Sequence, residues 1–88
     1  MGNDAFLKLC KEKVAEYYNN HVDKSDGAKP MTADDVFVVW SCKTLQNNKA
    51  LLSTPVSDGM YYELTYNGDK NELYFDAYKK WENICFKL

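Results

Sequence analysis

The spacing of apolar residues changes along this chain, and that change limits the folds open to it. Between Asp4 and His21 they recur at three- and four-residue steps, which predicts an amphipathic helix. The stripe consists of Phe6, Leu9, Cys10, Val14, Tyr17, Tyr18 and His21. From Val36 onward, apolar and polar residues alternate instead, as in β-strands. One helix followed by several strands predicts an α+β protein.

Four strands are expected after the helix, and polar turns separate them. They cover residues 36–43, 49–54, 60–66 and 71–76. Asn67-Gly68 is a strong hairpin signal, since its turn needs two residues with positive φ. We expect a four-residue loop over 67–70, which places Leu64 opposite Leu73 and avoids opposing two glutamates. A two-residue loop has the same parity, so one face carries Met60, Tyr62, Leu64, Leu73 and Phe75 either way.

The first of these strands is apolar on both faces in its first half. This pattern predicts a central strand that is covered on both sides. Alternation assigns one face to Val36, Val38, Trp40 and Cys42. Cys42 is therefore expected in the core, and so are Cys10 and Cys85.

The C-terminal residues are expected to form a short helix, because several apolar residues have helical spacing. These are Ala77, Trp81, Ile84, Cys85 and Leu88. A fifth strand over Trp81–Lys87 is the alternative. A polar loop is expected over Asp23–Asp35, with a turn of helix at its end. The predicted architecture is a single domain, 1–88, in which the N-terminal helix packs on a four-stranded antiparallel sheet.

Composition restricts the classes of function. The net charge is −2 and every basic residue is Lys. A sequence-specific nucleic-acid-binding protein is therefore disfavoured, because Arg makes most of the specific contacts to bases. No apolar stretch approaches the ~18 residues of a membrane span. The first residues lack the basic and apolar regions of a signal peptide. We expect a cytoplasmic protein with reduced thiols and no membrane association.

Catalytic and metal-binding motifs are not recognised in the sequence. The spacing of Cys10, His21, Cys42 and Cys85 matches no zinc pattern. A Cys42 nucleophile beside Lys43 would need His21 as its base, and the spacing does not support that pair. We therefore expect no enzyme, no cofactor and no metal ion.

A candidate partner-binding surface lies on the expected third and fourth strands. Tyr61, Glu63, Tyr74 and Asp76 share the face opposite the apolar one. Tyrosines among acids are typical of protein interfaces. The alternative is that Tyr61 and Tyr74 only form a stabilising cross-strand pair.

A second candidate surface is the polar turn after the first strand. It comprises Trp40, Lys43, Gln46 and Asn47. The alternative is an ordinary hairpin tip.

Three blocks of the chain resemble a family of small uncharacterised proteins from phages and prophages of low-GC Gram-positive bacteria. They cover Asp35–Asn47, Asp58–Lys70 and Asp76–Asn83. The family is a domain of unknown function, so the resemblance implies no catalytic residues. It implies a small accessory phage protein in the host cytoplasm.

We therefore expect a non-enzymatic module that binds and modulates a host or phage protein, in replication, gene control or counter-defence. The alternative is a small-ligand or nucleotide binder with a pocket between helix and sheet. A homodimer is also an expectation, since exposed sheet edges promote self-association.

Overall fold

The computed structural model describes residues 1–21 and 29–88, which form one α-helix, one short 3-10 helix and four strands. The elements are α1 (Asn3–His21), η2 (Ala33–Asp35), β1 (Phe37–Thr44), β2 (Asn47–Ser53), β3 (Met60–Asn67) and β4 (Glu72–Lys79). The strands lie in the order β1-β2-β3-β4, and each pairs antiparallel with its neighbour. The predicted α+β class is confirmed. Part of the predicted loop Asp23–Asp35 lies outside the described residues. No described helix is long and apolar enough to cross a membrane.

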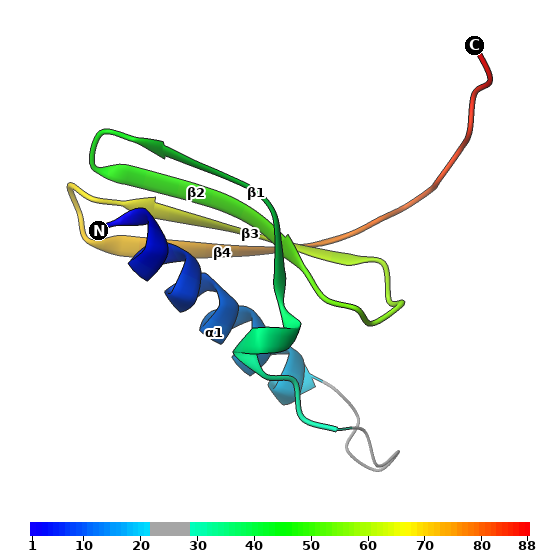
Figure 1. Ribbon diagram of the computed structural model, residues 1–88, viewed down its shortest axis with the longest axis horizontal. Coiled ribbons are helices and arrows are strands. Elements are labelled where there is room, and N and C mark those ends of the chain that lie inside the picture. Colours follow the sequence, from blue (N-terminus) through cyan, green and yellow to red (C-terminus); the bar gives the residue numbers. More distant parts are fainter. Residues whose placement is uncertain (22–28) are drawn as a thin grey trace.

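The helix α1 covers one face of the sheet, and the core lies between them (Figure 1). The core side chains are Phe6, Cys10, Val14 and Ala15 of α1, with Met31, Val36, Ala50, Leu52, Tyr62 and Leu64. Burial of each large apolar side chain contributes about 1.5–3 kcal/mol. The opposite face, which we call the outer face, is not covered by any described element.

The β3–β4 register differs by two residues from the predicted one. Leu64 lies opposite Phe75, and not opposite Leu73. The cause is the Asn67 side chain, whose Oδ1 accepts the backbone N–H groups of Asp69 (3.0 Å) and Lys70 (3.3 Å) inside the loop. A two-residue shift preserves parity, so the predicted apolar face is confirmed. Tyr62 and Leu64 are buried there, and Met60, Leu73 and Phe75 pack against them.

β1 is an edge strand, so the predicted central strand covered on both faces is wrong. A bulge lies between Val38 and Trp40, where one extra residue interrupts the pairing with β2. Beyond the bulge, Trp40 lies opposite Leu51 and Cys42 opposite Lys49. Both side chains are therefore on the outer face. The prediction that Cys42 belongs to the core is also wrong, because this thiol is exposed.

The predicted C-terminal helix is not present, and neither is the alternative fifth strand. Ala77–Lys79 belong to β4, and residues 80–88 form neither helix nor strand. Pairing with β3 takes up Ala77, one of the apolar residues on which the predicted helical spacing depended. The segment leaves the sheet and extends away from it (Figure 1). Cys85 is exposed in this segment, which contradicts its predicted core position.

The tips of the two hairpins bind each other. Gln46 Nε2 donates to Asp69 Oδ1 at 2.7 Å, and the Gly68 backbone N–H donates to Asn47 Oδ1 at 3.0 Å. Gly68 lies so close to the Gln46 carbonyl that a Cβ at this position would collide with backbone. The β1–β2 and β3–β4 hairpins are thus joined at one end of the sheet, in addition to the β2–β3 pairing.

We predict that Gly68→Ala lowers the free energy of unfolding by about 2 kcal/mol, because the added methyl group forces the two tips apart. Urea denaturation would measure this loss. Gly2→Ala is the control, since a Cβ there meets nothing within 4 Å. Equal effects of the two substitutions would contradict close packing at the tips.

Cys10 is fully buried, and burial raises the pKa of its thiol from 9.0 to about 12. The thiol of the unfolded chain loses its proton first as the pH rises. We therefore predict that the free energy of unfolding falls between pH 9 and about pH 12, by about 1.4 kcal/mol per pH unit from this group. Urea denaturation at several pH values would measure the slope. Cys10→Ala should remove this part of the slope, and an unchanged slope would contradict the prediction.

Candidate functional site

The outer face brings the two predicted candidate surfaces together. Across the four strands, Trp40 lies opposite Leu51, Leu51 opposite Glu63, and Glu63 opposite Asp76. The bulge in β1 produces this row, because it moves Trp40 onto the face that carries the acids. Sequence alternation alone assigned Trp40 to the opposite face, and no sequence signal marked the bulge.

Aromatic side chains flank this row on both sides. Tyr61 lies opposite Tyr78, and Tyr74 lies opposite Thr65. The alternative interpretation of Tyr61 and Tyr74 as a cross-strand pair is therefore wrong. Trp40 is 42% exposed and Tyr74 is 49% exposed, so large parts of both rings contact solvent. Sequence reasoning missed Tyr78, because it assigned residues 77–88 to a helix.

Carboxylates dominate the charge of the outer face. Glu63 lies directly opposite Asp76, an unfavourable arrangement of like charges. Lys49 Nζ lies 3.5 Å from Glu63 Oε1 and offsets part of this repulsion. The Tyr74 hydroxyl donates to Glu72 Oε2 at 3.2 Å, and this carboxylate raises the pKa of Tyr74. Within the described part of the chain, no ion pair neutralises Asp76.

The other predicted contact residues bind groups of their own chain. Lys43 Nζ donates to the Leu45 carbonyl at 2.8 Å. Gln46 and Asn47 join the two hairpin tips, as described above. These three side chains therefore stabilise the turn regions, whereas Trp40 is free to contact a partner.

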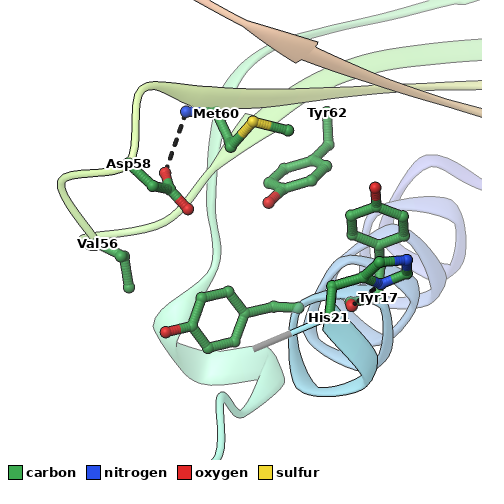
Figure 2. Close-up of a pocket in the computed structure, with 7 residues that line it drawn as sticks. Tyr17, His21, Val56, Asp58, Met60 and Tyr62 are labelled. Carbon is green, nitrogen blue, oxygen red and sulfur yellow. Dashed lines mark hydrogen bonds between the residues drawn. The ribbon is translucent and has the colours of Figure 1, made fainter. Parts of the chain in front are cut away.

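A pocket of about 420 Å³ lies on the opposite side of the sheet, between the last turn of α1 and the β2–β3 loop (Figure 2). Its lining comprises Tyr17, Tyr18, His21, Val56, Asp58, Met60 and Tyr62. The Met60 backbone N–H donates to Asp58 Oδ1 at 3.0 Å, which holds this carboxylate at the rim. Burial, and then the Asp58 charge, raise the pKa of Tyr62. The lining is thus aromatic and carries a negative charge.

His21 is held at the end of α1 and does not approach a thiol nucleophile. Its ring stacks on Tyr17 with 4.0 Å between centroids, and its Nδ1 lies 2.7 Å from the Tyr17 carbonyl oxygen. Cys42 is on the outer face, so the sheet separates the two residues. Among residues 1–21 and 29–88, no group of three His, Cys, Asp or Glu side chains is placed to hold a metal ion.

Comparisons with known proteins place this chain in a family. No curated protein and no solved structure matched the chain. A family described as of unknown function, DUF6275, matches residues 7–88. The match includes the outer face, the pocket and the C-terminal segment 80–88. Phage origin and bacterial host stay predictions. The chain belongs to the family of unknown function DUF6275.

Proposed function

We propose that this protein is a non-enzymatic binding module that docks on a host or phage protein through its outer face. The observation that carries the proposal is the row of Trp40, Leu51, Glu63 and Asp76, flanked by Tyr74, in which Trp40 and Asp76 are exposed and Leu51 and Glu63 are half-buried. An uncovered sheet face with this composition resembles the core of an interface, where Trp and Tyr contribute most of the binding energy.

The charges of the outer face indicate the chemistry of the partner. Among the strand residues that the structure places on this face, the carboxylates Glu63, Glu72 and Asp76 outnumber the one cation, Lys49. A complementary partner presents Lys or Arg side chains around an apolar patch that accepts Trp40. A nucleic-acid strand is disfavoured, because phosphates would approach these carboxylates.

The sequence resemblance to phage and prophage proteins supports an accessory role in the host cytoplasm. Proteins of replication and gene control fit the charge argument, since their nucleic-acid-binding surfaces are basic. Counter-defence is compatible with the same mode of action. In each case the module would act by occupying a basic surface of its target.

We predict that Trp40→Ala with Tyr74→Ala weakens binding to such a partner at least tenfold, since exposed aromatic anchors contribute about 2 kcal/mol each. Affinity capture from host lysate would supply the candidate, and calorimetric titration of the purified pair would measure the affinity. Binding should also weaken with salt, because rim charges are screened.

Leu45→Ala is the matched control, because Leu45 is an exposed apolar residue at the hairpin tip and outside the row. It should leave the affinity within about twofold of that of the unchanged chain. A purified partner whose affinity is insensitive to the outer-face substitutions would overturn the proposed surface. If Leu45→Ala alone abolishes binding, the partner contacts the hairpin tip and not the outer face.

The pocket in Figure 2 favours a second candidate function, the binding of a small aromatic molecule. Its volume lies within the range of ligand sites, roughly 300–1,000 Å³. Among the described residues that line the pocket there is no Lys, whereas Asp58 contributes a carboxylate that a nucleotide phosphate would meet. Tyrosine faces and Asp58 suit a cationic aromatic molecule better.

We predict that tryptamine raises the melting temperature of the protein, whereas adenosine monophosphate does not, because only tryptamine offers a cation to Asp58. Thermal denaturation with increasing ligand would measure both. Asp58→Asn removes the charge and keeps an oxygen for the Met60 backbone N–H, so it should abolish the shift. A shift that persists in this variant would argue against the pocket.

A further inference from the structure

The C-terminal segment 80–88 carries large apolar side chains that contact almost nothing in the chain. Trp81 is 92% exposed and Phe86 is 78% exposed, and Ile84 is also exposed. Within residues 1–21 and 29–88, the hydrogen bond that holds this segment is at its start, where the Lys80 backbone N–H donates to the Gly59 carbonyl at 2.7 Å. The family match extends through this segment, so it belongs to the part that the family shares.

The segment continues directly from β4, which is an edge strand paired only with β3. Lys80 donates toward the β3 side. Because backbone groups alternate in direction along a strand, those of Phe75, Ala77 and Lys79 point toward the open edge. A further strand can therefore pair with β4 along its whole length.

The side-chain alternation of β4 also continues into the segment. Tyr74 and Tyr78 are on the outer face. If the chain stays extended, Ile84, Phe86 and Leu88 share that parity and fall on the same face. Residues 80–88 span about 30 Å at about 3.3 Å per residue, which is enough to cover the eight residues of β4.

We propose that segment 80–88 of each chain adds as a fifth strand to β4 of a second copy. The two β4 strands and their C-terminal segments then pair antiparallel around a two-fold axis, and the two sheets become continuous. The outer faces of both copies lie on the same side of this sheet. The inference is independent of the partner proposed above, which would bind that face.

Charge disfavours three registers of this pairing and favours one whose axis lies at Trp81. The residue on the two-fold axis lies opposite the same residue of the second copy. An axis at Lys79, Lys80 or Glu82 would oppose like charges. An axis at Trp81 instead stacks two tryptophans and places Lys80 opposite Glu82 of the second copy, twice. The same register sets Tyr78 opposite Ile84 of the second copy, an aromatic–aliphatic contact of the kind that stabilises sheets.

Charge reversal tests the register and the second copy together. Sedimentation velocity should show a dimer for the unchanged chain. Lys80→Glu and Glu82→Lys should each weaken it at least tenfold, because each variant opposes like charges twice. An equimolar mixture of the two variants should restore the dimer, since every Lys then faces a Glu of the other chain.

Lys79→Glu is the control, because Lys79 would lie on the other side of the sheet and opposite Asn83 of the second copy. It makes the same charge change as Lys80→Glu. It should weaken the dimer by less than about threefold.

Fluorescence of Trp81 gives an independent measurement in a Trp40→Phe chain. The emission should shift to shorter wavelength as protein concentration rises, because the exposed indole becomes buried. A monomer at all concentrations would overturn the proposal. If the Trp81 emission of that monomer is blue-shifted, the segment folds onto its own sheet, which also overturns the proposal. A dimer that neither variant weakens would overturn it as well.

Discussion

The fold depends on a single helix that covers one face of a sheet wider than the helix. A helix with its side chains is about 10–12 Å across, whereas four strands spaced about 4.8 Å apart extend over more than 14 Å. The contact between Phe6, Cys10 and Val14 on α1 and Ala50 and Leu52 on β2 therefore protects the centre of one face. The edge strands receive less cover, which explains why β1 is exposed along most of its length. Without a second helix, the outer face stays open to solvent.

The surfaces proposed for recognition are those that α1 leaves uncovered. The outer face offers Trp40 and tyrosines among carboxylates, and the β4 edge offers backbone groups together with the apolar C-terminal segment. The core itself is small and includes Asn48, a buried amide with no hydrogen-bond partner within the described residues. Such a group costs about 1–3 kcal/mol. Because the core contributes little net stability, burial of the exposed apolar surfaces against other proteins would stabilise the folded chain further.

Sequence reasoning predicted the side-chain faces correctly on β3 and β4, whose pairing is uninterrupted, and wrongly on β1, which contains a bulge. The faces of β3 and β4 were predicted because an error of two residues in register, Leu64 opposite Leu73 in place of Phe75, leaves every side chain on its face. The placement of Trp40 failed, because one extra residue in β1 has no sequence signature. The C-terminal prediction failed because Ala77 and Trp81 fit helical spacing, although pairing with β3 extends β4 through Lys79. Tyr61, Glu63, Tyr74 and Asp76 were nevertheless placed together correctly.

The bulge in β1 has an evolutionary consequence. Val38 pairs with Leu52 and Trp40 pairs with Leu51, so Val39 is the extra residue that the bulge accommodates. Deletion of Val39 would join Val38 directly to Trp40 and remove the bulge, while Trp40 would stay opposite Leu51 and the Cys42 thiol would stay on the outer face. Regular alternation through all the residues of β1 would instead turn both side chains toward the helix side. The strand can therefore lose one codon at the bulge without moving Trp40 or Cys42 to the other face.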